Sequence, residues 1–360
     1  MKIFVFGSSI TSSYWNGAAT YYRGIYKNLQ RLGHEIVFAE PDIYARQQKR
    51  DVGSIGYATV RVYQTPSELE AVLDEADGAN LVIKHSGVGA DDEFLESAVL
   101  DLRAPWRQIA FWDVDAPATL ARVHENQQDV FRSLIPEYDF IFTYGGGKPV
   151  VERYLELGAK NCIPIYNGLD PETHHPVPAS QELSCDLAFV GHRLPDREKR
   201  VEQYFLAAAE NAPDLRFILG GEGWGSRKLP ENVRWIGKLH AAFYTSSRLS
   251  LNINRESMAE VGFSPPTRVF EAAGSGACLI TDSWPGIAQF FVPGREILVA
   301  ESAEEVVRYL RETNAEQAKQ IGMAMRDRAL RDHTYQARAG EVDRILRSEN
   351  ISIDAVEVTV

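Results

Sequence analysis

Apolar and polar positions along the chain repeat in two alternating patterns. Short apolar runs, such as KIFVF at 2–6 and NLVIK at 80–84, are typical of buried strands. Between such runs lie stretches like 18–32, where apolar residues recur every three or four positions, and this period predicts amphipathic helices. Because strands and helices alternate, the pattern predicts an α/β fold with parallel, doubly wound sheets.

The first half of the chain follows this alternation without interruption. Its strands are predicted at KIFVF, HEIVFA, YATVRVY, NLVIK, RQIAFW and DFIFT. Its helices are predicted at 18–32, 66–76, 91–100 and 116–125. Gly33 follows the first of these helices as the expected C-cap residue.

A proline-rich stretch then interrupts the alternation. Residues 168–184 contain three prolines and no apolar period, which indicates a linker. Beyond it, strands are predicted at DLAFV, LRFILGG, VRWIG, LSLNI and ILVA, with helices between them. We therefore expect two Rossmann-like domains and a last helix, arranged as 1–170, a linker at 171–184, 185–335, a helix at 336–348 that could cross back to the first domain, and a tail at 349–360.

Composition and charge restrict the classes of function. The 360 residues suffice for two cores, and the formal net charge of −12 disfavours general binders of nucleic acid or anionic membranes. Cys162, Cys185 and Cys278 are widely spaced without a CxxC pair, so we expect reduced, buried thiols rather than a zinc site or disulfides. The N-terminus does not resemble a signal peptide, and no apolar run is long enough to span a bilayer. These features predict a soluble, cytoplasmic protein.

The stretch from Asn252 to Ile280 carries the most specific chemistry. A strand leads through a polar loop to Ser264 and Pro265, which we expect at the N-cap and at the first helical position. This helix is expected to end at 274–276, before the strand CLIT. Free N–H groups at a helix start suit a phosphate, and the carboxylate of Glu271, one turn inside, could accept hydrogen bonds from a ribose. The combination predicts a nucleoside diphosphate ligand.

Longer segments of the second half resemble a known family. DLAFVGHRLPDREKR, NVRWIGKL, SPPTRVFEAAGSGACLITDSWPGIAQFFVPGREILV and DHTYQAR resemble the CgeB-like branch of the group 1 glycosyltransferases, over most of residues 185–347. The first half resembles it chiefly through KHSG and FWDVDAP. The resemblance implies a GT-B fold, in which two Rossmann-like domains face a cleft. It also implies a sugar nucleotide donor, by default a UDP-sugar, on the C-terminal domain, an unknown acceptor on the N-terminal domain, and no metal or other cofactor.

The same resemblance implies roles for individual residues. Glu271 matches the glutamate that binds the donor ribose, and Gly191 matches the glycine beside the diphosphate. Arg193 resembles the phosphate-binding arginine of that loop but lies one position later than usual. The remaining donor residues belong to a loop that contacts the base and to the first turn of the helix near the pyrophosphate: Gly237, Lys238, Leu239, Thr267 and Arg268.

Simpler interpretations stand beside these roles. Arg268 precedes Glu271 by three residues and could pair with it instead. Lys199 and Arg200 are expected on a solvated helix face. The chain also departs from the wider family, whose retaining members carry a first glutamate eight positions before the ribose-binding one. Phe263 occupies that position here, so the resemblance does not supply the stereochemical course.

Candidates on the acceptor side follow the strands of the first half. Asp115, in the DVD sequence that starts at Asp113, is either a helix N-cap or a catalytic group. His85 is either a general base or a structural histidine. Asn16 and Gly17 belong to the first loop, which is expected to face the sugar and the acceptor. There Gly17 would cap the helix or permit close approach of the sugar.

Three other functions compete with transfer. Glu40 ends the second strand, where an acid would bind an NAD ribose, but the turn GSSITSSYWNG lacks GxGxxG and argues against an oxidoreductase. UDP-sugar epimerases share the two-domain layout. A nucleotide-sugar-binding protein with a degenerate active site would explain Phe263. The acidic charge makes duplex DNA the less favoured acceptor without excluding it.

Overall fold

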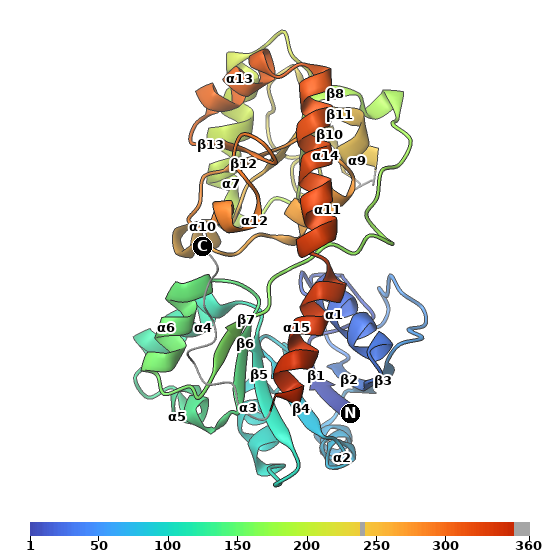
Figure 1. Ribbon diagram of the computed structural model, residues 1–360, viewed down its shortest axis with the longest axis vertical. Helices are drawn as coiled ribbons and strands as arrows, with labels where there is room; N and C mark the ends of the chain where they lie inside the picture. The colour runs from blue at the N-terminus through green and yellow to red at the C-terminus, as the bar shows by residue number, and fades with distance from the viewer. Residues whose placement is uncertain (238–241, 349–360) are drawn as a thin grey trace. The chain divides into compact units, whose positions relative to one another are not determined.

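The computed structural model describes residues 1–237 and 242–348, and it divides into two compact units. Among the described residues, unit 1 comprises Met1–Asn167 and 335–348, and unit 2 comprises Gly168–Thr334. The predicted tail at 349–360 lies outside the described residues. Each unit has its own parallel sheet (Figure 1). Each unit also has its own apolar core. The doubly wound α/β architecture predicted from the sequence is therefore present in both units.

Unit 1 is built on seven parallel strands in the order β3-β2-β1-β4-β5-β6-β7. The strands are β1 (Lys2–Phe6), β2 (Glu35–Pro41), β3 (Thr59–Tyr63), β4 (Leu81–His85), β5 (Gln108–Asp113), β6 (Phe140–Thr143) and β7 (Cys162–Pro164). The helices are α1 (Ala19–Arg31), α2 (Pro66–Ala76), α3 (Asp92–Asp101), α4 (Ala116–Glu125), α5 (Val130–Leu134) and α6 (Gly147–Glu156). The sequence pattern predicts the first six strands, whereas β7 has three residues, too few to show a period.

The chain returns to unit 1 through its last helix, α15 (Tyr335–Arg347). This helix packs along α1, and the two helices lie side by side in Figure 1. Tyr335, Ala339 and Val342 of α15 join the same apolar core as β1 and β4. Gly24 of α1 makes this packing possible, because a Cβ atom at this position would lie 2.3 Å from the ring of Tyr335.

Unit 2 is built on six parallel strands in the order β10-β9-β8-β11-β12-β13. The strands are β8 (Cys185–Val190), β9 (Phe217–Gly220), β10 (Val233–Ile236), β11 (Ser247–Asn252), β12 (Leu279–Asp282) and β13 (Leu298–Ala300). The helices are α7 (Pro195–Val201), α8 (Ala207–Asn211), α9 (Ala242–Ser246), α10 (Glu256–Val261), α11 (Thr267–Gly274), α12 (Ile287–Phe290), α13 (Ala303–Glu312) and α14 (Ala315–Asp332). A π-helical turn at Glu202–Leu206 joins α7 to α8.

The start of α11 differs from the sequence prediction. The helix begins at Thr267, with Pro266 at the N-cap position in an extended conformation, so Ser264 does not cap it. Two consecutive prolines explain the delay, because proline disfavours the helical conformation in the residue before it. The loop expected after β11 also contains a short helix, α10. The helix end is as expected, since α11 stops at Gly274 and Gly276 follows with φ +73°.

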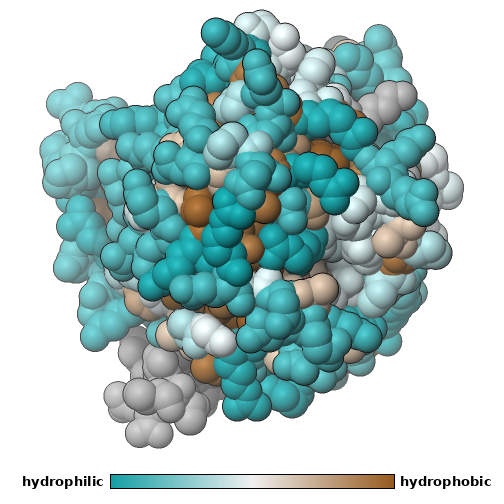
Figure 2. Space-filling view, turned by 90° about the horizontal axis from the view of Figure 1, so that it is seen from above, coloured by the Kyte–Doolittle hydropathy of each residue, from teal (hydrophilic) through white to brown (hydrophobic). Residues whose placement is uncertain are grey.

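The face seen in Figure 2 and the described helices both agree with a sequence that has no apolar run long enough to span a bilayer. The face shown in Figure 2 is mostly hydrophilic, with apolar residues confined to small patches. Within the described ranges, no helix combines the length and the apolar character that a membrane span requires. Cys162, Cys185 and Cys278 are free and buried, as the sequence predicts.

Candidate functional site

The turn that follows β8 brings a glycine and an arginine into close contact. The Gly191 amide donates to the Gly220 carbonyl at 2.9 Å, which fixes the turn against β9. A Cβ atom at Gly191 would lie 2.8 Å from Nη2 of Arg197, on α7. Glycine here leaves room for the guanidinium over the turn, and a Cβ atom would force the guanidinium to shift. The sequence prediction names Gly191 but misses Arg197.

Arg197 is a buried cation whose hydrogen bonding is incomplete. It is 4% exposed, one Nη donates to the His192 carbonyl, and its Nε has no hydrogen-bond partner within the described residues. Burial, and secondarily the neighbouring charges of Arg268 and Arg255, lowers its pKa to about 8, although nearby carboxylates act in the opposite direction. A guanidinium stays protonated at neutral pH. The buried charge of Arg197 therefore destabilises the folded protein, and a bound anion would reduce this destabilisation.

Arg268 and Glu271 lie on the first turns of α11 but do not pair. One Nη of Arg268 donates to the Ile253 carbonyl at 3.1 Å, and its guanidinium lies over the ring of Phe189. The carboxylate of Glu271 is half-buried and makes no hydrogen bond or ion pair within residues 1–237 and 242–348. Burial, and secondarily the Glu271 charge, raises the pKa of the nearby Tyr244. Glu271 thus remains available to accept hydrogen bonds.

Of the other predicted donor residues, Arg193 already has a charged partner and two lie outside the described residues. Arg193 forms an ion pair with Glu198 at 2.7 Å, so its cation is already neutralised. Thr267 is half-buried at the first helical position of α11. Gly237 follows β10, where a Cβ atom would lie 3.3 Å from the ring of Trp235. The predicted residues Lys238 and Leu239 lie outside the described residues.

Arg200 is not on a solvated face, contrary to the sequence prediction, whereas Lys199 is exposed. Arg200 forms an ion pair with the fully buried Asp282, at the carboxyl end of β12, at 2.7 Å. The same carboxylate accepts from the Asn254 amide at 3.0 Å. The side-chain oxygen and nitrogen of Asn254 are buried without a partner among the described residues. Polar groups that could receive a ligand thus gather at the carboxyl ends of β8, β11 and β12, where open α/β sheets bind their ligands.

Phe263 occupies a strained position at the place of the family's first glutamate. Its φ is +50°, a conformation that costs a bulky residue free energy. The ring packs on Gly286, where a Cβ atom would lie 2.2 Å from it, and the Phe263 amide donates to Pro285. Of the nearby acids, Glu256 pairs with Arg200 at 3.5 Å. Phe263 therefore contributes packing rather than a carboxylate.

In unit 1, Asp113 organises the loop that contains Asp115. The carboxylate of Asp113 accepts from Ser86 at 2.7 Å, Tyr154 at 2.5 Å, Thr119 at 3.1 Å and the Asp115 amide at 3.0 Å. Asp115 stands at the N-cap position of α4, yet its side chain makes no capping hydrogen bond. Asp113 instead fixes this helix start, and Asp115 is left half-buried at the carboxyl end of β5.

His85 is enclosed in the aromatic core of unit 1. It has no exposed surface, its Nε2 lies 2.5 Å from the Tyr26 hydroxyl, and its ring packs against Tyr22 and Trp112. Burial is the main cause that lowers its pKa to about 3. A neutral, enclosed imidazole favours the structural interpretation of His85 over the general base.

The first loop is fixed by internal hydrogen bonds. Asn16 is buried, donating to the carbonyls of Ser9 and Ser12 and accepting from the Ser8 hydroxyl. Gly17 is exposed and does not cap α1, whose N-cap residue is Ala18, and a Cβ atom at Gly17 would meet nothing within 4 Å, so the prediction that the sugar approaches here stays a prediction.

The carboxylate of Glu40 is held by hydrogen bonds from neighbouring loops. It is fully buried, and its carboxylate accepts from the amides of Ile10 and Thr11, at 2.6 and 3.3 Å, and from Gln47 at 2.6 Å. These bonds occupy the acid that an oxidoreductase would need for an NAD ribose. Glu40 is therefore not available to bind the ribose of NAD, which argues against an oxidoreductase.

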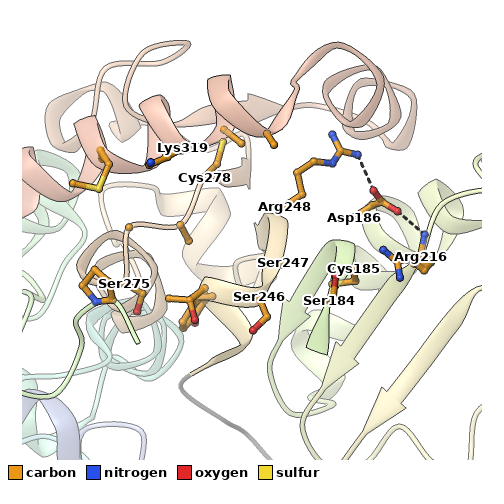
Figure 3. A pocket seen from close by; sticks show the side chains of 18 residues that line it. Ser184, Cys185, Asp186, Arg216, Ser246, Ser247, Arg248, Ser275, Cys278 and Lys319 are labelled. Atoms are coloured by element: carbon orange, nitrogen blue, oxygen red, sulfur yellow. Dashed lines mark hydrogen bonds and ion pairs between the residues drawn. The ribbon is translucent and has the colours of Figure 1, made fainter. Parts of the chain in front are cut away.

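A cavity of about 580 Å³ lies at the opposite edge of the sheet of unit 2. It is lined by residues at the amino ends of β8 and β11, including Ser184, Cys185 and Ser247 (Figure 3). On one side Asp186 links Arg248 and Arg216 by hydrogen bonds and an ion pair. Because Gly191 and Arg268 lie beyond the carboxyl ends of these parallel strands, this cavity is separate from them.

The candidate residues of unit 2 and those of unit 1 include carboxylates, which are among the side chains that bind metal ions. Across the part of the chain that the structure describes, no three His, Cys, Asp or Glu side chains lie together as a metal-binding group.

Comparison with known proteins relates these features to a class. Residues 197–344 match the family described as glycosyl transferase-like. No curated protein matches the chain. Sucrose-phosphate synthase from Thermosynechococcus elongatus has a similar structure, with 14% identity, a TM-score of 0.67, and coverage of 96% of this chain and 98% of that chain.

Two further solved structures were determined with ligands. HepE from Anabaena, in complex with UDP and glucose, is 13% identical with a TM-score of 0.70, over 96% of this chain and 99% of that chain. An α-glucosyltransferase in complex with UDP and a 13-mer DNA containing an HMU base is 10% identical with a TM-score of 0.66, over 97% of this chain and 100% of that chain.

The predicted GT-B fold is confirmed by these structural likenesses. Residues 197–344, which match the glycosyl transferase-like family, hold Arg197, Arg268 and Glu271. The prediction of a glycosyltransferase is thus confirmed at the level of its class.

Proposed function

We propose that this protein transfers a glycosyl group from a nucleoside diphosphate sugar, with unit 2 binding the donor and unit 1 binding the acceptor. One observation carries the proposal: within the described part of unit 2, Arg197 is a buried guanidinium with an unused donor, and the carboxylate of Glu271 accepts no hydrogen bond. A nucleoside diphosphate offers a group for each, namely its phosphate oxygens and its ribose hydroxyls.

The chemistry follows from where charge develops. An acceptor hydroxyl attacks the anomeric carbon and loses its proton, while the bond from that carbon to the diphosphate oxygen breaks. The diphosphate leaves with the bonding electrons and gains negative charge. Arg197 and Arg268 would stabilise this charge without a metal ion, and because the fold already holds both, they need little reorganisation.

Asp115 is our candidate for the group that accepts the proton. It is half-buried beyond the carboxyl end of β5, with its backbone fixed by Asp113, whereas His85 is enclosed. A carboxylate held in place without full burial can approach a substrate hydroxyl.

Three finer assignments belong to the same proposal. The donor is a UDP-sugar, which the UDP complexes of two structural neighbours support. The chain belongs to the CgeB-like branch, for which its sequence segments in unit 2 are the support. It acts in the cytoplasm, where its three free cysteines would stay reduced.

Calorimetric titration with UDP and UDP-glucose tests the donor assignment. Glu271→Ala removes an acceptor for the ribose, and because hydrogen bonds to charged groups contribute about 1.5–3 kcal/mol, we expect the Kd to rise by roughly 10- to 100-fold. Arg193→Ala is the matched control, since Arg193 is paired with Glu198. Unchanged affinity in Glu271→Ala, with the same melting temperature, would contradict the proposal.

Incubation with UDP-glucose alone separates transfer from the competing functions. A transferase releases UDP slowly by hydrolysis and produces no isomeric sugar nucleotide. Formation of the C2 or C4 epimer would identify an epimerase. An intact donor after prolonged incubation, bound at stoichiometry, would indicate a binding protein.

A further inference from the structure

Unit 1 exposes two large aromatic side chains beyond the carboxyl ends of adjacent strands. Trp15 is 76% exposed in the loop that follows β1, and Tyr44 is 63% exposed in the loop that follows β2. Strands β1 and β2 pair in parallel, so both loops emerge at the same edge of the sheet. Ligands of open α/β sheets bind at this edge.

A buried arginine brings the two aromatic residues together. Arg46 is 6% exposed, and it donates to the Trp15 carbonyl at 3.3 Å and to the Ser8 carbonyl at 3.1 Å. The same guanidinium lies 5.3 Å from the centre of the Tyr44 ring. Trp15 and Tyr44 are therefore neighbours on one surface.

The two loops are also fixed to each other. The carboxylate of Glu40 binds amides of the first loop and the side chain of Gln47 in the second. The Ser12 hydroxyl donates to the Lys49 carbonyl at 2.9 Å. The aromatic pair thus stands on a rigid support, which lowers the entropy cost of binding.

Both aromatic residues are held in an unfavourable backbone conformation. Trp15 has φ +48° and Tyr44 has φ +54°, in the left-handed region that bulky residues avoid. Exposed rings recover little of this cost by burial. Strain that is maintained by surrounding hydrogen bonds, and that presents side chains to solvent, is typical of binding sites.

We propose that Trp15 and Tyr44 form an acceptor subsite that stacks against a sugar ring of a carbohydrate acceptor. This inference rests on the proposed function and names its acceptor class. The C–H groups on one face of a pyranose ring carry partial positive charge and pack on the negative face of an aromatic ring. A sugar ring also offers hydroxyls at its edge, which water or loop polar groups can solvate.

Nearby charges favour a carbohydrate over a nucleic acid. Arg23 is paired with Asp51 at 2.8 Å, and Lys49 lies over the Tyr14 ring at 3.8 Å. Arg46 is buried against carbonyl oxygens. Bases stacked on an aromatic surface bring phosphates that need such cations, and the net charge of −12 opposes them further.

An array of immobilised neutral oligosaccharides, with single-stranded and duplex DNA oligonucleotides beside them, tests the proposal on the full-length protein. We expect binding to at least one oligosaccharide, and we expect Trp15→Ala and Tyr44→Ala each to weaken it by about tenfold or more. Trp15→Phe should restore part of the affinity, because it keeps a ring. The matched control is Trp106→Ala, since Trp106 is 69% exposed before the amino end of β5.

Several results would overturn the inference. These are the absence of oligosaccharide binding, preferential binding of DNA, or equal binding by wild type, Trp15→Ala and Tyr44→Ala. UDP titration of the same variants separates the two proposals. Loss of oligosaccharide binding with unchanged UDP affinity supports the subsite, whereas failure of the wild type to bind UDP contradicts the donor assignment itself.

Discussion

Replacing Arg197 by methionine should have opposite effects on stability and on donor binding. Arg197 is 4% exposed, and burial with neighbouring arginines lowers its pKa from the ordinary arginine range to about 8. At 1.36 kcal/mol per pKa unit, this shift corresponds to roughly 6 kcal/mol of unfavourable free energy for the charged form. Methionine keeps an unbranched apolar side chain and removes the charge.

Only part of that free energy should be recovered. The substitution also leaves the His192 carbonyl without its donor, which costs about 1–3 kcal/mol. Apolar replacement of buried ionic groups is often stabilising by about 1–4 kcal/mol. We therefore expect Arg197→Met to stabilise ligand-free unit 2 by about 2 kcal/mol, which is roughly 4–8 °C in melting temperature for a unit of this size.

The same variant should bind UDP about 10- to 100-fold more weakly, because it loses one or more charge-assisted hydrogen bonds to phosphate. Scanning calorimetry without and with saturating UDP, together with titration calorimetry, measures both effects. Arg193→Met serves as the control, with little change in UDP affinity expected. A lower ligand-free melting temperature together with unchanged UDP affinity would refute the reasoning on both counts.

Three further predictions concern the core of unit 1. His85 stays neutral in the native state down to about pH 3, whereas in the unfolded chain it takes up a proton below pH 6.5. The free energy of unfolding should therefore decrease as the pH is lowered from 6.5 to 3, by at most roughly 5 kcal/mol. In urea unfolding, the free energy of unfolding of His85→Gln should depend less steeply on pH than that of the wild type. An equal slope against pH would contradict this prediction. Gly24→Ala should cost about 1–3 kcal/mol by forcing Tyr335 away, with partial rescue by Tyr335→Leu. Asp113→Asn should cost about 2 kcal/mol, since an amide cannot accept from all four donors, whereas Tyr154→Phe should cost less.

The order of strands and helices could be predicted because each core imposes a period on the sequence. Runs such as KIFVF are buried along almost their whole length, and α15 covers the range expected from its apolar spacing. The beginning of α11 could not be predicted in the same way. Ser264-Pro265 satisfies the usual rule for a capped helix start, but Pro266 disfavours the helical conformation at Pro265, and the helix begins only at Thr267.

The donor candidates show a similar limit. Motif spacing directs attention to Arg193, yet Arg193 is neutralised by Glu198 and Arg197 is not. A signal was present in the sequence, since Arg197 precedes the buried Val201 and Phe205 at intervals of four and so lies on the apolar face of its helix. An arginine on the apolar face of a helix is a stronger indication of a binding residue than an arginine whose position merely matches a family motif. No comparable sequence signal marks His85 as buried, because its enclosure depends on rings from α1 and β5.

The return of α15 to unit 1 has a consequence for synthesis on the ribosome. Unit 1 begins with the first residue but lacks a helix that covers α1 until residues 335–347 have been made. Unit 2 is continuous in sequence and is complete by Thr334, so it can reach its final structure first, although it is encoded second. A fragment ending at Asn167 would expose the apolar face of α1 that Tyr335, Ala339 and Val342 normally cover. Joining the segment 335–348 ahead of Met1 would supply that cover, so a circular permutant of unit 1 should remain in solution where the simple truncation aggregates.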